Sequence, residues 1–239
     1  GNIYKEKGYY DLEIESYKKA LLIQPNHAQS YNNMGKALKA KGDLDAAIEQ
    51  FKNALNIETT FAEAHYNLGV ALQEKGNLNA AIQSYKKACE IKPDNTKYHF
   101  FIGNAYKNNG DPDAAINSYK QAIKTAPNDA DLYNNMGNIL RDNGQLDAAI
   151  DSYRNALKIK PKYAEVYNNK GVALMEKGEL DAAINSCKQA IKIKPDYAEA
   201  YNSMGLSLKE KGESDAAIDS YKEALKIKPD YATPYNNMG

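Results

Sequence analysis

Apolar residues recur along the chain with the spacing of an amphipathic helix. Tyr31, Met34 and Leu38 stand at relative positions zero, three and seven. This spacing places them on one face of an α-helix, and Gly35 falls on the same stripe. Gly42 comes after the stripe and suits the left-handed conformation that often ends a helix. The pattern therefore predicts a helix that ends at Gly42.

A second apolar stripe begins a few residues later and is wider than the first. A wide stripe indicates a helix that is buried on more than one side. Asp45 stands near its start, where an acidic side chain favours the positive end of the helix dipole. The stripe consists of Leu44, Ala47, Ile48, Phe51, Ala54, Leu55 and Ile57. Residues 28–61 are therefore expected to form a helix–turn–helix unit.

Two glycine series mark a period of 34 residues, which is typical of stacked-repeat proteins. The first series lies inside the first helix of each unit and consists of Gly1, Gly35, Gly69, Gly103, Gly137, Gly171, Gly205 and Gly239. The second lies in the turn and consists of Gly8, Gly42, Gly76, Gly110, Gly144, Gly178 and Gly212. We predict one array of full units at 28–61, 62–95, 96–129, 130–163, 164–197 and 198–231, with partial units at 1–27 and 232–239.

Glycine inside a helix costs about 1 kcal/mol relative to alanine, so the first series indicates a steric requirement. Alanines recur on the second helix, at Ala47 and Ala54 and their counterparts, and we expect the two helices to approach closely where Gly meets Ala. Glu13 stands at the position of Ala47, which predicts different packing in the first unit. Lys170 stands at the position of Met136 and is expected to extend from the core edge to water.

Most units close with a proline that is followed by a short polar residue. A proline cannot continue a helix, and Asn or Asp favours the position that caps the next one. The residues expected to cap the first helices are Asn26, Asp94, Asn128, Asp196 and Asp230.

Charge and cysteine usage exclude several classes of partner. The 31 basic and 31 acidic residues balance, so no net charge attracts nucleic acid or an anionic membrane. No apolar run approaches the ~20 residues that span a bilayer, and no signal-peptide pattern is visible. Cys89 and Cys187 are too far apart in the array to pair and occupy apolar positions, as is usual in a reducing compartment. We expect a cytoplasmic protein that binds neither nucleic acid nor membrane.

No motif for catalysis, a metal or a cofactor appears, and we predict a chain that is not an enzyme. His65 and His99 stand at aromatic core positions, where packing is expected, and His27 stands in a turn. One cation recurs on each second helix, either on a solvated face or as a stripe for an anionic partner. This series consists of Lys18, Lys52, Lys86, Lys120, Arg154, Lys188 and Lys222.

The unit resembles the tetratricopeptide repeat (TPR), and the resemblance covers the whole chain. In residues 130–163 the positions that match the family pattern in order are Tyr133, Met136, Gly137, Leu140, Ala149, Tyr153, Ala156 and Pro161. The family often has Trp at the first of these positions, where this chain has Tyr or His. The resemblance implies an all-α, right-handed superhelix whose first helices line a concave groove, and a role in binding other proteins.

Asparagines recur on the face of the first helix that lies opposite the apolar stripe. A side-chain amide offers both a donor and an acceptor, and can therefore pair with the backbone of an extended ligand. The candidate peptide-binding amides are Asn32, Asn33, Asn67, Asn134, Asn135, Asn168, Asn169 and Asn202. The series resembles the asparagine ladder in the TPR superhelix of O-linked N-acetylglucosamine transferases. Alternatively, these amides follow the family consensus or bond between neighbouring repeats.

Aromatic residues interrupt the amide series once. Phe100 and Phe101 stand at two amide positions, and Tyr66 lies on the matching face of the unit before. Clustered rings on a groove wall predict a pocket for an apolar anchor of the partner. The alternative is that the rings fill the space between adjacent units.

Three functions are compatible with this sequence. The first is an interaction scaffold that holds an extended peptide or protein segment in the groove. The second is the substrate-recruiting arm of a larger enzyme, such as a protein glycosyltransferase, whose catalytic domain is absent from this sequence. The third is head-to-tail self-association, in which residues 232–239 complete the partial unit that begins at Gly1 of a neighbouring molecule.

Overall fold

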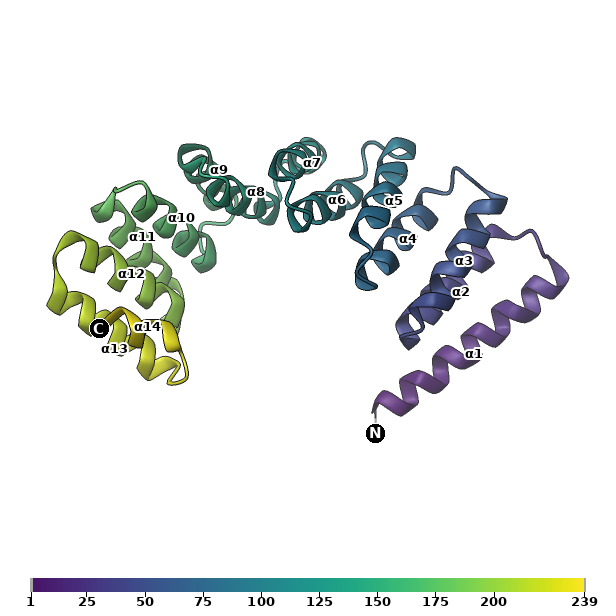
Figure 1. The fold of residues 1–239 in the computed structure, drawn as a ribbon, viewed down its shortest axis with the longest axis horizontal. Helices are drawn as coiled ribbons and strands as arrows, with labels where there is room; N and C mark the ends of the chain where they lie inside the picture. The colour runs from purple at the N-terminus through teal and green to yellow at the C-terminus, as the bar shows by residue number, and fades with distance from the viewer. Residues whose placement is uncertain (1, 239) are drawn as a thin grey trace. The chain divides into compact units, whose positions relative to one another are not determined.

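The computed structural model describes residues 2–238 as a succession of helices and turns, and the side chains of residues 9–237 (Figure 1). No strand occurs in that part of the chain, and the predicted all-α fold of repeated helix pairs is confirmed. Gly1 and Gly239 lie outside the described residues, and so does part of the predicted head-to-tail contact. The helices are α1 (Asn2–Ile23), α2 (Ala28–Lys41), α3 (Leu44–Ile57), α4 (Ala62–Glu74), α5 (Leu78–Ile91), α6 (Thr96–Asn108), α7 (Pro112–Thr125), α8 (Ala130–Asp142), α9 (Leu146–Ile159), α10 (Ala164–Glu176), α11 (Leu180–Ile193), α12 (Ala198–Lys211), α13 (Ser214–Ile227) and α14 (Ala232–Met238).

The chain divides into two compact units, Gly1–Thr125 and Ala126–Gly239. Within each unit, the two helices of a repeat pack against one another, as α2 does with α3 and α10 with α11. First helices also touch first helices of the next repeat, for example α2 with α4 and α10 with α12, whereas successive second helices barely touch. The first helices therefore form the more tightly packed layer of each unit, and open grooves separate the second helices.

The second glycine series forms the turns of the helix pairs. Gly42 has φ 95° and its amide bonds to the carbonyl of Lys39, which closes α2. Gly76, Gly110, Gly144, Gly178 and Gly212 share this left-handed conformation, as the sequence predicted.

The first unit departs from the sequence prediction. Gly8 lies inside α1, so the turn predicted there is replaced by one continuous helix. Glu13, which stands at the position of the fully buried Ala47, is half-buried. Large apolar side chains of α1, which packs against α2, are exposed, among them Leu12 and Leu22.

The first helices begin one residue later than the sequence predicted. Asn95 caps α6 by accepting a hydrogen bond from the amide of Tyr98 at 3.1 Å, and Asp129 caps α8 through the amide of Asp131 at 3.0 Å. The residues before them, Asp94 and Asn128, lie in the turn. At the other first helices His27, Phe61, Tyr163 and Tyr197 occupy the cap position without a side-chain bond.

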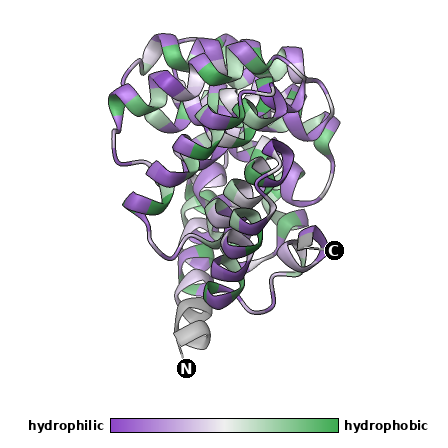
Figure 2. Ribbon diagram, turned by 90° about the vertical axis from the view of Figure 1, so that its left-hand side faces the viewer, coloured by the Kyte–Doolittle hydropathy of each residue, from purple (hydrophilic) through white to green (hydrophobic). Residues whose placement is uncertain are grey.

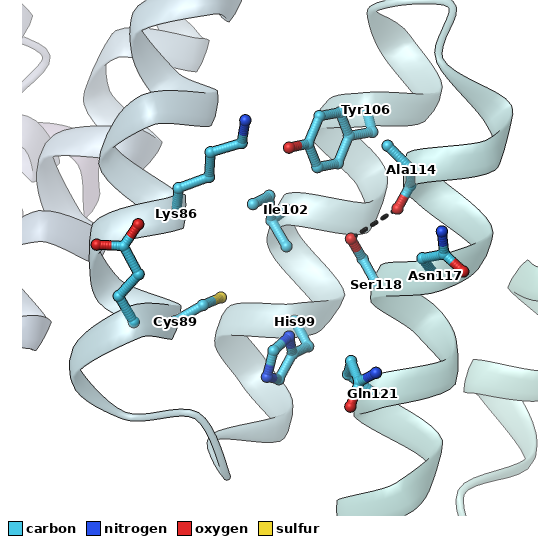
Figure 3. Close-up of a pocket in the computed structure, with 10 residues that line it drawn as sticks. Lys86, Cys89, His99, Ile102, Tyr106, Ala114, Asn117, Ser118 and Gln121 are labelled. Atoms are coloured by element: carbon cyan, nitrogen blue, oxygen red, sulfur yellow. Dashed lines mark hydrogen bonds between the residues drawn. The ribbon is translucent and has the colours of Figure 1, made fainter.

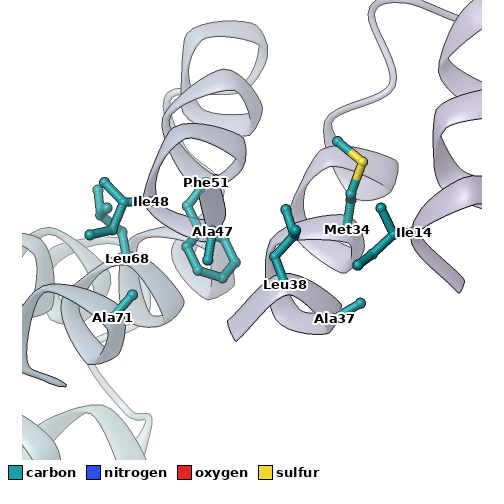
Figure 4. Close-up of a cluster of buried hydrophobic side chains, with 9 residues drawn as sticks. All are labelled: Ile14, Met34, Ala37, Leu38, Ala47, Ile48, Phe51, Leu68 and Ala71. Atoms are coloured by element: carbon teal, nitrogen blue, oxygen red, sulfur yellow. The ribbon is translucent and has the colours of Figure 1, made fainter. Parts of the chain in front are cut away.

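The helices are amphipathic, and hydrophilic and hydrophobic residues alternate along them in Figure 2. In the unit Gly1–Thr125, one cluster of buried side chains joins α1 to α4 (Figure 4). It includes Ile14, Met34, Leu38, Phe51 and Leu68. Each repeat thus shares its core with the next, as expected of a solenoid.

The glycines inside the first helices meet rings, which corrects the predicted contact with alanine. A Cβ built on Gly35 would lie 2.6 Å from Cε1 of Phe51, and one on Gly137 would lie 2.6 Å from Cε1 of Tyr153. Gly171 differs because its neighbour is the sulfur of Cys187, at 2.8 Å. Ala47 and Ala54 of α3 are fully buried, but the aromatic ring on the same helix is what requires glycine opposite.

Candidate functional site

The first amide of each pair on the first helices is buried, which differs from the outward position expected from the sequence. Asn32 has no exposed surface, and Asn134, Asn168 and Asn202 are 4%, 7% and 6% exposed. These side chains, the inner amides, lie between adjacent repeats. A buried amide needs hydrogen-bond partners, so their surroundings decide what they do.

Three of the four inner amides bond to an amide of the next repeat, 35 residues further on. The Nδ2 of Asn67 donates to Oδ1 of Asn32 at 2.9 Å. The same bond joins Asn169 to Asn134 at 3.1 Å and Asn237 to Asn202 at 3.0 Å. The second amides of the pairs are here called the outer amides, and Asn67, Asn169 and Asn237 are thereby held by the repeat that precedes them.

Glutamate side chains of the next repeat accept hydrogen bonds from two of the inner amides. The Nδ2 of Asn32 lies 3.4 Å from Oε1 of Glu63, and the Nδ2 of Asn134 lies 3.4 Å from Oε1 of Glu165. Asn32 and Asn134 therefore each accept from one neighbour and donate to another. The sequence analysis did not select these glutamates, although both stand at the same position in their repeats.

The slot between repeats accepts an apolar pair at one place in the unit Gly1–Thr125. Tyr66 occupies the inner position of its repeat, and Phe101, 35 residues later, occupies the outer position. Their ring centroids are 5.1 Å apart in an edge-to-face arrangement. An apolar pair thus replaces the amide pair, and Tyr66 is buried in the core rather than exposed on a pocket wall.

One amide pair is incomplete. Asn168 is followed at the outer position by Ser203, whose hydroxyl instead donates to the carbonyl of Glu199 at 2.9 Å. The Oδ1 of Asn168 is buried and has no hydrogen-bond partner. The short serine side chain explains the missing bond.

The outer amides form the exposed part of this surface. Asn33, Asn67, Asn135 and Asn169 are half-buried. The Oδ1 of Asn33 accepts from Nε2 of Gln29 at 3.1 Å. Among the described residues no donor reaches the Oδ1 of Asn67 or Asn169, whose other end is fixed by the inner amide. In each compact unit we call the surface that carries the outer amides the amide face, with Asn33 and Asn67 in Gly1–Thr125 and Asn135 and Asn169 in Ala126–Gly239.

The aromatic residues beside the amide face support one another. The ring of Phe101 lies 5.5 Å from that of Phe100, and the ring of Phe100 lies 6.0 Å from that of Tyr119, both edge to face. Tyr98 stacks on Tyr66 at 5.3 Å. Tyr98 and Tyr66 are buried, whereas Phe100 and Phe101 are half-buried and keep an open side.

Charges along the first helices are paired between repeats. Lys39 lies 2.9 Å from Glu74, and the Nε of Arg141 lies 4.0 Å from Glu176. Like the amide pairs, both ion pairs join residues 35 positions apart, as Lys39 and Glu74 illustrate. At these two places the positive charge of one repeat is therefore balanced by a carboxylate of the next.

The titratable side chains show no arrangement for catalysis. The Nε2 of His65 bonds to the carbonyl of Thr59 at 2.9 Å, and that of His99 bonds to the carbonyl of Pro93 at 2.6 Å, so both rings tie down turns. Both cysteines are free thiols, and burial raises the pKa of Cys89 to about 11 and that of Cys187 to about 12. Neither thiol is a ready nucleophile at neutral pH.

The described residues contain no group of three or more His, Cys, Asp or Glu side chains that could hold a metal ion. In the same part of the chain, no helix has the length and apolar character that crossing a membrane requires.

The family model described as "TPR repeat" matches residues 1–42, 35–76, 71–110, 103–140, 137–178, 171–212 and 205–239. These matches follow one another along the whole chain. The comparison with curated proteins gave no match.

Solved structures of several TPR proteins are similar to this chain. MamA is 32% identical, with a TM-score of 0.64 over 69% of this chain and 96% of its own. YrrB, described as a TPR protein with an unusual peptide-binding site, is 24% identical, with a TM-score of 0.70 over 83% of this chain and 99% of its own. The C-terminal part of a TPR repeat-containing protein from Cytophaga hutchinsonii is 17% identical, with a TM-score of 0.79 over 99% of both chains. With the period of its glycines, its helix pairs and the family match along its whole length, this chain belongs to the tetratricopeptide repeat family.

Proposed function

We propose that this protein is an interaction scaffold that holds an extended peptide or protein segment along the amide face. The observation that carries the proposal is the fixed orientation of the outer amides. Asn67 and Asn169 each use Nδ2 to bond to the preceding repeat, and each keeps Oδ1 without a donor from the described residues. An acceptor held in this way is suited to a backbone N–H of an extended ligand.

The inner amides have a positioning role in this proposal. Asn32 and Asn134 are buried and do not reach the ligand, but they set the direction of the outer amides. Preorganised polar groups bind more tightly because less side-chain entropy is lost on binding. Of the residues that the sequence indicated, Asn33, Asn67, Asn135 and Asn169 are therefore the proposed contacts. Asn32 and Asn134 support Asn67 and Asn169, whereas Asn202 bonds to Asn237 and Asn168 faces Ser203 and supports no contact.

Phe100 and Phe101 provide an apolar contact where the amide series is interrupted. Both rings are half-buried, and the buried Tyr66 and Tyr119 pack against them from behind. A rigid aromatic pair with one open side suits an apolar anchor residue of the ligand. Because the neighbouring charges are paired between repeats, the expected ligand has mixed or polar character rather than a strong net charge.

The family supports this function at a coarser level. TPR proteins are interaction proteins, and YrrB, which has a similar fold, is described as having a peptide-binding site. The alternative drawn from the sequence, a substrate-recruiting arm of a larger glycosyltransferase-like enzyme, would use the same amide face. It differs in requiring a catalytic domain in the same polypeptide.

Backbone methylation of a bound peptide tests the proposed contact. A peptide is selected from a displayed random library against the protein, and single N-methyl groups are then placed along its backbone. Where an outer amide accepts an N–H, methylation is expected to weaken binding about fivefold to tenfold, since one such hydrogen bond contributes about 1 kcal/mol. Titration calorimetry measures the dissociation constants.

In Asn67→Ala, N-methylation at one peptide position is expected to stop weakening the binding, because the accepting Oδ1 of Asn67 has been removed. Asn79→Ala, which removes an exposed amide from the second helix α5, serves as the matched control. Asn32→Ala breaks the same bond between repeats but keeps the Oδ1 of Asn67, and so separates orientation from contact. If N-methylation at every peptide position weakened binding equally in Asn67→Ala and in the unmodified protein, the amide face would be excluded as the binding surface.

A further inference from the structure

The grooves between successive second helices contain pockets that repeat along the chain. One pocket of about 480 Å³ lies between α5 and α7, with α6 as its floor (Figure 3). A second pocket of about 290 Å³ lies between α9 and α11, with α10 as its floor. The two are equivalent, because Arg154, Lys170 and Gln189 stand two repeats after Lys86, Ile102 and Gln121.

The floors of these two pockets differ in one residue. Ile102 is buried in the α6 floor, and the same position holds Met34, Leu68, Met136 or Met204 in the other full repeats. In α10 this position holds Lys170, which is half-buried. A cation therefore replaces an apolar side chain only in the groove between α9 and α11.

Lys170 has no anionic partner among the described residues. No carboxylate there lies within 4.0 Å of its ammonium group, and the nearby charge is the guanidinium of Arg154. Burial lowers the pKa of Lys170, and the positive charge of Arg154 lowers it further. Burial and the like charge of Arg154 both disfavour the charged form of Lys170, and no counter-charge from the described residues offsets them.

The carboxylates near this groove are already engaged. Asp151 lies 2.8 Å from Arg154, and Glu179, which lines the pocket, lies 2.7 Å from Lys177. Side chains that can donate hydrogen bonds, those of Tyr167, Asn185 and Gln189, line the same pocket, and the Tyr167 ring centroid lies 5.3 Å from Nζ of Lys170.

We propose that the groove between α9 and α11 binds a small oxyanion, a carboxylate or a phosphate group, with Lys170 as its central ligand and Arg154 as the second cation. The oxyanion supplies the counter-charge that Lys170 lacks, and the amides of Asn185 and Gln189 donate hydrogen bonds to its oxygens. This site opens between the second helices α9 and α11, with Lys170 on the first helix α10, and none of the outer amides lines it.

Titration with sodium phosphate and with sodium acetate, at constant ionic strength, tests the site. Backbone amide shifts of residues 167–189 are followed by nuclear magnetic resonance. Saturable shifts with a dissociation constant on the order of 1 mM are expected. The residues of the groove between α5 and α7, whose floor is Ile102, are expected not to respond and provide an internal control.

Lys170→Met, which restores the residue type of three other repeats, is expected to weaken binding at least tenfold without loss of the fold. Ile102→Lys, beside Lys86, is expected to create a second site in the groove between α5 and α7. A capped tetraglutamate peptide tests whether a carboxylate of a polypeptide can bind in the groove between α9 and α11. If this peptide were the only probe that bound, and Lys170→Met abolished its binding, the oxyanion would be an acidic side chain of a protein partner. The proposal would be overturned if none of the probes produced a shift, or if the shifts persisted in Lys170→Met.

Discussion

Among the described side chains, two buried polar atoms lack a hydrogen-bond partner, and a single substitution within the repeats explains each. The Oδ1 of Asn168 lacks one because Ser203 stands where other repeats have asparagine. The hydroxyl of Tyr221 lacks one because Leu206 stands where Asn138 accepts from Tyr153 at 2.7 Å. A buried polar group without a hydrogen bond costs about 1–3 kcal/mol, so these two positions weaken the array.

Ser203→Asn is expected to raise the free energy of unfolding by about 1 kcal/mol, because the new amide donates to Oδ1 of Asn168. The equivalent position already holds Asn67 and Asn169 in other repeats, so the side chain fits. Urea denaturation followed by circular dichroism measures the change. In an Asn168→Ala background the gain is expected to disappear, and a gain of the same size there would contradict the proposed bond.

At the scale of the helix pair, the close approach of two helices depends on a ring that packs over a glycine. A Cβ on Gly205 would lie 2.5 Å from Cε1 of Tyr221, and one on Gly103 would lie 3.0 Å from Cε2 of Tyr119. Real Cβ atoms do not come as close as the first distance, so a methyl group forces the ring or the helix to move. The pair formed by Gly171 and Cys187 shows that a small side chain can replace the ring.

Gly205→Ala is expected to lower the free energy of unfolding by about 1–3 kcal/mol, despite the better helix propensity of alanine. Gly103→Ala, at the longer distance, is the matched comparison and is expected to cost less. Thermal denaturation of both variants measures the difference. If both substitutions stabilised the protein, the ring contact would not be the reason for the glycine.

The sequence predicted the helix pairs well because their signals are local. The left-handed turn at Gly42 and the stripe of α2 depend on residues within a few positions of one another. Contacts between repeats were predicted less well. Asn32 and Asn33 are neighbours on one helix, and only the packing of the next repeat decides that the first is buried and the second half-exposed.

A signal for the contact between repeats was nevertheless present in the sequence. Tyr66 and Phe101 depart from asparagine at the two positions that meet, and the spacing of 35 residues that links them recurs in Asn32 and Asn67. The period of 34 residues hides this pairing, because it compares equivalent positions rather than touching ones. The ring opposite Gly137 was missed for a related reason. Periodicity identifies which residues recur but not which side chain fills the space between two helices.

Across the molecule, the same buried phenol recurs on the second helices. Tyr85, Tyr119 and Tyr153 have no exposed surface, and burial raises the pKa of each above its ordinary value of 10.0. Tyr66, in the core beside Tyr85, has its pKa raised to about 12 by burial. Because the stability of a repeat array is roughly the sum of its repeats and their interfaces, these phenols act together on the whole array.

Alkaline pH is therefore expected to unfold the protein through these tyrosines. Below pH 10 the phenols are protonated in both states, and their contribution to stability is fully present. Above pH 10 the unfolded phenols lose protons that the folded ones retain, so stability falls as pH rises, by at most about 1.4 kcal/mol per pH unit for each phenol. Urea midpoints between pH 8 and pH 11.5 measure the slope. Tyr85→Phe, which copies the native Phe51, is expected to reduce it. Complete ionisation of all 19 tyrosines while helicity stays unchanged would contradict this account, because the buried phenols are expected to ionise only as the array unfolds.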